Sequence, residues 1–153
     1  MIITLADVTQ SLAYESGLEW HPTQVSRLVL DNSYYVPRLV DVRTEVATYI
    51  DRMQDRHLTY RWGEYDCNAY AMIWYAWVKF QAWQDDELRP PWPFGYFFSG
   101  GRKNSSVVEG HAMNMCLVRG LDDGLFWVWI EPQTGAIGVA RRCEWGKVWL
   151  AMI

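Results

Sequence analysis

The hydrophobic pattern of the sequence changes near residue 107 from that of helices to that of strands, and this change limits the folds that the chain can adopt. From there on, apolar residues recur with period two, as in strands, within VVEGHAMNMCLV, LFWVWIEP, GAIGVARR and KVWLAMI. The sequences GLDDG and PQTG separate the first three segments and fit tight connections. Helical signals fill the part before residue 107. Helices followed by an antiparallel meander predict an α+β domain in which a helix packs on the sheet.

Three helices are predicted in the first part of the chain. Thr4, followed three residues later by Asp7, is a capping pattern that predicts a short helix over residues 5–16. An amphipathic helix is predicted over residues 40–54, with one apolar face made of Val42, Val46, Tyr49, Ile50 and Met53. The third helix, over residues 67–83, carries apolar residues most of the way round, which predicts that the fold encloses it.

Length and charge narrow the class of protein. The 153 residues fit a single domain, in which residues 1–30 are predicted to form an N-terminal extension. The net charge of −4 excludes the basic field of a general nucleic-acid binder. The first residues lack a basic segment followed by an apolar core, and no apolar run is long enough to cross a membrane. Neither a signal peptide nor membrane insertion is therefore expected.

Residues 84–106 are rich in proline, glycine and aromatic residues. Long loops are usually functional or disordered, and this many aromatic residues argue against disorder. We predict an ordered loop that either walls a cleft or is a plain connection over the core. Trp92 and Phe97 of this loop, together with Trp62, are candidate substrate contacts, and residues 92–98 are a candidate contact surface for a protein partner.

Cys67 stands at the predicted start of the third helix, directly after Asp66. The first turn of a helix has unpaired N–H groups and a dipole that favours an anion, so a thiolate there has a lowered pKa. The charge of Asp66 opposes this unless capping or a metal occupies its carboxylate. The alternative is a small buried cysteine that only packs, as most free cysteines do. Cys116 is predicted to pack, and Cys143 has no candidate base near it in the sequence.

A histidine and a glutamate are predicted to meet on the sheet. If GLDDG is a hairpin loop, Arg119 opposes Leu125, and by the same register Met113 opposes Glu131. His111 is two residues from Met113 and therefore lies on the same strand face. Diagonal neighbours of this kind are about 7–8 Å apart, which long side chains can bridge. An unpaired glutamate at the end of LFWVWI is costly if buried, and a histidine partner explains it. The alternative is an exposed strand end.

The order of DC at a helix start, GHAMN on one strand and EPQTG on the next resembles a known family. It is the papain-like cysteine-protease domain of a mushroom chimeric lectin, the agglutinin C-terminal domain, which has similar stand-alone domains in bacteriophages. The resemblance runs from about Leu30 to the C-terminus. It implies a papain-like fold with Cys67 as nucleophile, His111 as general base and Glu131 as the group that orients the imidazole. That lectin's sugar-binding trefoil has no counterpart here, so its lectin activity is not expected.

The resemblance also implies a divalent metal near the site, typically calcium, which needs several oxygen ligands. Asp66, Asn68 and Gln133, with Glu131, are the candidates, although the family often has more acid just after the cysteine. Papain-like enzymes often place a glutamine before the cysteine as a second donor to the oxyanion. The stretch HLTYRWGEYD contains none, so that donor is left open among Arg61, Trp62 and a backbone group.

Three functions are open from the sequence. The leading one is a phage-type thiol protease or amidase that cleaves an amide bond of a peptide or cell-wall peptide, in the host cytoplasm or on the virion. The second keeps the papain-like fold as an inactive binding module, associated with the virion or directed at the host. The third is a host-directed factor that binds a small ligand in the cleft.

Overall fold

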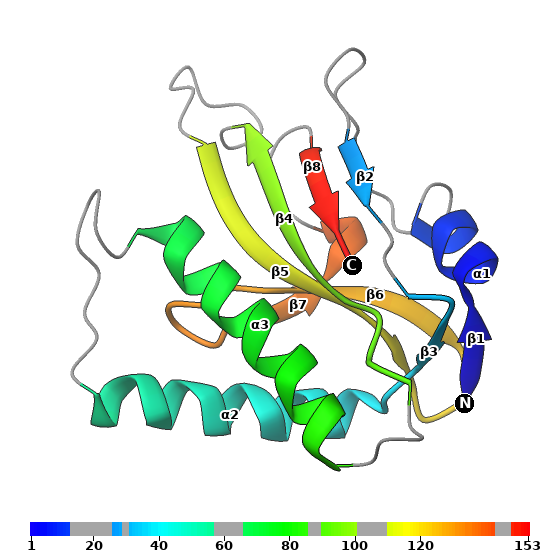
Figure 1. Cartoon of the computed structure of the whole chain (residues 1–153), viewed down its shortest axis with the longest axis horizontal. Coiled ribbons are helices and arrows are strands. Elements are labelled where there is room, and N and C mark those ends of the chain that lie inside the picture. Colours follow the sequence, from blue (N-terminus) through cyan, green and yellow to red (C-terminus); the bar gives the residue numbers. More distant parts are fainter. Residues whose placement is uncertain (13–25, 29–30, 57–65, 86–89, 101–109, 143–147) are drawn as a thin grey trace.

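The computed structural model describes residues 1–12, 26–28, 31–56, 66–85, 90–100, 110–142 and 148–153 (Figure 1). In chain order the elements are β1 (Ile2–Thr4), α1 (Leu5–Gln10), β2 (Ser26–Leu28), β3 (Ser33–Tyr35), α2 (Leu39–Asp55), α3 (Cys67–Asp85), β4 (Phe94–Gly100), β5 (Gly110–Arg119), β6 (Leu125–Ile130), β7 (Ile137–Val139), the 3₁₀ turn η2 (Ala140–Arg142) and β8 (Val148–Met152). This is the predicted α+β arrangement. Within the described residues, no helix is long and apolar enough to span a membrane.

The main sheet has six strands in the order β2-β8-β4-β5-β6-β7, and β1 pairs separately with β3. Strands β5, β6 and β7 form the predicted antiparallel meander. The fourth predicted strand does not extend it. Instead β8 crosses to the other side of the sheet, where it pairs antiparallel with β4 and parallel with β2. The crossing gives β4 a hydrogen-bonded partner on its second edge.

The prediction of a loop over residues 84–106 is wrong in its central part. Residues 94–100 form β4, which lies inside the sheet between β8 and β5. The aromatic residues that suggested a cleft wall favour strands, and no proline interrupts them after Pro93. Of the rest of that segment, the structure describes residues 84–85 at the end of α3 and residues 90–93, which lead into β4.

The cap of α3 is the one predicted from the sequence, but the predicted enclosure of this helix is not found. Asp66 caps the helix because its Oδ1 accepts hydrogen bonds from the backbone N–H groups of Asn68 and Ala69, at 3.0 and 3.2 Å. The helix is not enclosed, however. Met72 is 53% exposed and Phe80 is 47% exposed, because α3 rests on one face of β4 and β5 (Figure 1).

The other two helices begin where they were predicted, although α1 ends at Gln10 and not at residue 16. Thr4 and Asp7 form a reciprocal capping box at the start of α1. The apolar face of α2 is buried at Val42, Val46, Tyr49 and Met53.

Hydrophobic clusters lie on both faces of the sheet, as the alternation of strand residues requires. On the α1 face the cluster includes Val8, Leu12, Phe97, Met113, Met115 and Trp127. On the face of α2 and α3 it includes Val42, Trp74, Phe94, Cys116, Val128 and Ile130. The sheet therefore lies between α1 on one face and α2 and α3 on the other, with the first turn of α3 near one end of β5.

Candidate active site

The hairpin of β5 and β6 brings His111 and Glu131 together as predicted. Arg119 pairs with Leu125, and Asn114 pairs with Ile130. The His111 Nε2 and Glu131 Oε2 atoms are 2.7 Å apart, and the two side chains are 12% and 19% exposed. A short hydrogen bond to a carboxylate in such partial burial fixes the orientation of the imidazole ring.

Cys67 is the first residue of α3, and its thiol meets the same histidine. The imidazole of His111 is hydrogen-bonded to the Cys67 sulfur, and the backbone N–H of Ala112 also donates to it. Cys67 packs beside Ala71, Tyr96 and Ala112, where α3 crosses β4 and β5. Cys67, His111 and Glu131 thus form a connected chain of contacts between a helix start and two neighbouring strands.

The electrostatic interactions among Cys67, His111 and Glu131 favour a charged thiolate–imidazolium pair. Burial alone raises the pKa of the Cys67 thiol, but the hydrogen bonds from His111 and Ala112 outweigh it and the net pKa lies below the ordinary value. Burial likewise lowers the pKa of His111, and its contacts with Cys67 and Glu131 reverse this and raise the pKa to about 9. Because the two groups titrate together, both shifts belong to the pair.

Asp66 opposes this effect, because its negative charge raises the pKa of Cys67, but to a smaller extent than His111 and Ala112 lower it. Its carboxylate is occupied by the helix cap, which is the condition the sequence required. A second polar contact lies beside it. The hydroxyl of Tyr96 donates to Asn68 Oδ1 at 3.0 Å. No sequence pattern indicated this pair, since the two residues lie 28 positions apart on different elements.

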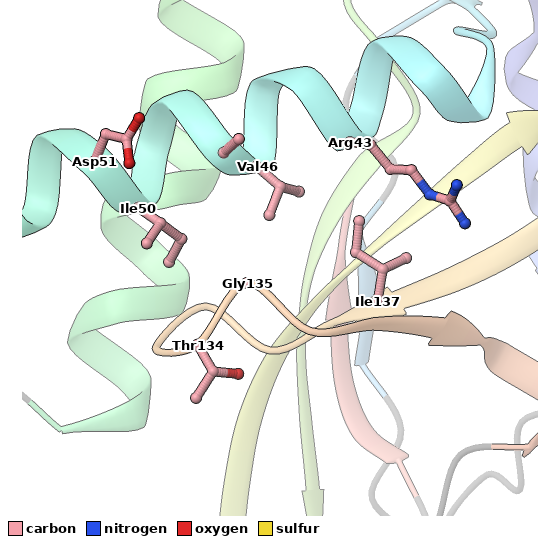
Figure 2. A pocket seen from close by; sticks show the side chains of 8 residues that line it. Arg43, Val46, Ile50, Asp51, Thr134, Gly135 and Ile137 are labelled. Carbon is pink, nitrogen blue, oxygen red and sulfur yellow. The ribbon is translucent and has the colours of Figure 1, made fainter.

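The turn after β6 holds Glu131 in place. The backbone N–H of Glu131 donates to Ala136 O, and that of Gly135 donates to Glu131 O, at 2.9 and 2.8 Å. Gly135 has a φ of +73° and rests on α2, where an added Cβ would lie 3.0 Å from Ile50 and 3.1 Å from Val46. Figure 2 shows this turn under α2, at a shallow groove of about 500 Å³ whose rim carries Arg43 and Asp51.

Two predicted contact roles are corrected by burial. Phe97 is 0% exposed and packs edge-on against Trp127 on the α1 face, so it cannot contact a substrate. Phe94 is also fully buried and Tyr96 nearly so, which removes most of residues 92–98 as a surface for a partner. Trp92 is half-buried against the core of α2 and α3, and its role stays a prediction. Trp62 and Cys143 lie outside the described residues.

The predicted calcium ligands are only partly arranged as a metal site. Among the described residues, no three His, Cys, Asp or Glu side chains are grouped so that they could hold a metal ion. Asp66 Oδ1 and Asn68 Oδ1 already accept hydrogen bonds, and Gln133 contacts Glu131 Oε1 through its backbone N–H, at 3.4 Å. Calcium binding by Asp66, Asn68 and Gln133 therefore stays a prediction.

Comparison with known proteins identifies the fold through solved structures. No protein-family model matches the sequence, and no curated protein matches it either. The structure of PSL1a in its complex with E64 superposes with a TM-score of 0.74 at 18% identity, over 99% of this chain and 50% of that one. The Polyporus squamosus lectin bound to the human-type influenza-binding epitope Neu5Acα2-6Galβ1-4GlcNAc superposes with a TM-score of 0.69 at 17% identity, over 99% of this chain and 49% of that one.

These similarities support the mushroom-lectin part of the resemblance found in the sequence. At this level of identity they show a shared fold. The chain spans about half the length of either matched structure.

Proposed function

We propose that this protein is a papain-like cysteine hydrolase that cleaves an amide bond, with Cys67 as nucleophile, His111 as general acid and base, and Glu131 as the orienting group. The observation that carries the proposal is the continuous contact from the Cys67 sulfur through His111 to Glu131, at the start of a helix. A nucleophile, a base within hydrogen-bonding reach and a third group that orients the base are the minimum for this chemistry.

The reaction follows from these contacts. The Cys67 thiolate attacks the carbonyl carbon of the amide, and the carbonyl π electrons move to oxygen. As that intermediate collapses, the C–N bond breaks and His111 gives its proton to the leaving amine. Water, deprotonated by His111, then attacks the thioester and releases a carboxylic acid and the free thiol. Glu131 keeps the ring in place throughout and stabilises its charged form.

The substrate class proposed is a peptide or a cell-wall peptide, as the resemblance to phage domains implies. The fold neighbours do not narrow it further, because their similarity supports the fold alone. A divalent cation such as calcium is included as a variable in the assay, since the resemblance implies one near the site.

Alkylation of the cysteines in the native protein, followed by mass spectrometry at each site, tests the proposal. We expect Cys67 to react with iodoacetamide at pH 6 much faster than Cys116, and to lose this advantage in His111→Ala. Labelling by E64, an epoxide that a thiolate can open, should show the same dependence. A Cys67 that is inert at pH 6, or equally reactive with alanine at 111, contradicts the hydrolase.

A second candidate function is suggested by the ligand in one of the matched structures. One fold neighbour is a lectin bound to a sialylated trisaccharide. We therefore also propose a binding module in which the thiol is not used. Titration of this protein with Neu5Acα2-6Galβ1-4GlcNAc by calorimetry tests it: binding that is equal in wild type and Cys67→Ala supports the module. Absence of heat with the wild type contradicts carbohydrate binding of this kind.

A further inference from the structure

We propose that the side-chain amide of Asn68 is the second hydrogen-bond donor to the oxyanion formed on the substrate of Cys67. This inference rests on the proposed hydrolase. It fills the role that the sequence left open, since the stretch before the cysteine contains no glutamine. An oxyanion at this site needs donors that are fixed before the reaction begins.

The capping of α3 decides which backbone donors are free. The N–H groups of Asn68 and Ala69 both point at Asp66 Oδ1 and are used there. Within the described part of the chain, no acceptor is bonded to the Cys67 N–H, which stands first in the helix. That N–H is therefore the one backbone donor of residues 67–69 that is left for an oxyanion, and any second donor from these three residues has to be a side chain.

The side chain of Asn68 is the neutral donor next to the nucleophile. Its Oδ1 accepts the hydroxyl of Tyr96 at 3.0 Å, so the amide group is held with its oxygen toward the sheet and its nitrogen on the other side. Among the described residues no acceptor is bonded to that nitrogen. Asn68 as a whole is only half-buried, so the helix start is not closed around this residue.

Tyr96 is well placed to hold this amide because it is itself fixed. It is 7% exposed and lies on β4, which pairs with β5 so that Phe98 opposes Ala112 and Ser99 opposes His111. The strand that orients Asn68 is therefore bonded directly to the strand that carries the general base. Asn68 would touch the reacting atoms, and Tyr96 acts through Asn68 as a positioning residue.

A carbonyl probe separates this role from the reactivity of the thiol. N-acetylglycinal is a small aldehyde. The Cys67 sulfur adds to its carbonyl carbon, the π electrons move to oxygen, and a proton from His111 completes a hemithioacetal. The adduct protects Cys67 from iodoacetamide, and half-protection measures the affinity for the aldehyde. Iodoacetamide itself alkylates the sulfur without forming an oxyanion.

In Asn68→Ala we expect the affinity for the aldehyde to fall by about tenfold or more, by analogy with the loss of one oxyanion donor. The rate of alkylation by iodoacetamide in the absence of aldehyde should stay within about twofold of wild type, because the thiolate pair is intact. Tyr96→Phe should lower the aldehyde affinity less, since the donor remains and only its orientation is released. Asn32→Ala, an exposed asparagine away from the site, is the matched control and should change neither quantity.

The outcomes separate the two proposals. Unchanged aldehyde affinity in Asn68→Ala, with Cys67 still reactive toward iodoacetamide, overturns the role of Asn68 and leaves the hydrolase standing. Wild-type protein that reacts with iodoacetamide but is not protected by aldehyde also overturns it, because such a site stabilises no oxyanion. A Cys67 that is inert toward iodoacetamide removes the hydrolase, and the role of Asn68 falls with it.

Discussion

Cys67 begins α3 and Cys116 lies on β5 beneath the same helix, and the surroundings of the two cysteines have opposite effects on a thiol. Cys67 sits at the open end of α3, half-buried, with His111 and the Ala112 N–H on its sulfur. Cys116 is 0% exposed between α3 and the sheet. Burial there raises the pKa of Cys116 far above the ordinary thiol range, and the positive charge of Lys79 offsets only part of this.

The difference shows that a helix face by itself does not make a cysteine reactive. Burial favours the neutral form of both thiols. Only at Cys67 do the neighbouring hydrogen-bond donors and the positive charge lower the pKa by more than burial raises it. Position at the helix end matters because it leaves room for those partners. The variants below test how much of the contrast each partner supplies.

Removal of His111, the proposed general base, should have the largest effect. In His111→Ala we expect hydrolysis of any amide substrate to fall by about 10²–10⁴-fold, which is the usual contribution of a positioned acid and base. Alkylation of Cys67 at pH 6 should slow toward that of an unactivated thiol, because the cation that lowers its pKa is gone. Rates at both cysteines, measured by mass spectrometry, check this. A Cys67 that keeps its reactivity would show that the helix start and Ala112 suffice.

Neutralising Glu131, the proposed orienting carboxylate, should have the next largest effect. Glu131→Gln removes the charge that helps to raise the pKa of His111 to about 9, so that pKa should fall. The imidazolium is then lost at lower pH, and the range over which the charged pair exists narrows from its alkaline side. The imidazole titration followed by NMR measures this directly.

We expect hydrolysis by Glu131→Gln to drop by about 10–100-fold, as for other partners that orient a reactive group. An NMR titration in which His111 keeps a pKa of about 9 would mean that Cys67 alone stabilises its charge. Asp55→Asn, which neutralises an exposed carboxylate at the end of α2, is the comparison variant and should change neither the His111 pKa nor the rate.

A substitution in the turn under α2 should affect the Cys67 site indirectly, through the position of Glu131. Gly135→Ala places a Cβ against Ile50 and Val46 at a φ of +73°, which should cost about 1–2 kcal/mol of unfolding free energy. The turn that holds Glu131 should shift, so alkylation of Cys67 at pH 6 should slow as well.

Urea denaturation and cysteine labelling measure the two effects of Gly135→Ala. Gly124→Ala, in the hairpin loop at a permitted φ, is the control and should change stability by about 0.5 kcal/mol or less. If Gly135→Ala lowers stability and leaves labelling unchanged, the turn supports the fold and not the site.

The smallest effect is expected from the buried cysteine. Cys116→Ala leaves a small cavity beside Trp74 and Val128 and should lower the unfolding free energy by about 1 kcal/mol. The labelling rate of Cys67 should stay the same, because no contact of its thiol is removed. A changed rate at Cys67 would mean that the core under α3 and the helix start are coupled.

The sequence predictions that succeeded depend on interactions between residues close together in the chain. Thr4 with Asp7 and Asp66 with the next two N–H groups are caps, which depend on a single turn of chain. The loop GLDDG fixed the register of β5 and β6, and strand alternation then placed His111 within reach of Glu131. These parts of the site follow from the order of residues, because no distant segment is needed to define them.

The predictions that failed depended on contacts between distant segments. The prolines and glycines around Phe94 and Phe97 obscured a strand whose place between β8 and β5 is set by partners more than ten residues away. The outer face of α3 is apolar in composition, yet only the packing decides which side meets the sheet.

The amino-acid sequence by itself determined the helix starts, the hairpin register and the pair of His111 with Glu131. The tertiary structure alone decided that Cys67 reaches His111, that Tyr96 holds Asn68, and that Phe97 faces away from the site. The physical reason is the range of the forces involved. Caps, turns and the pleat are set by neighbouring residues, whereas the order of strands and the position of a helix on them follow from burying both faces of one sheet together.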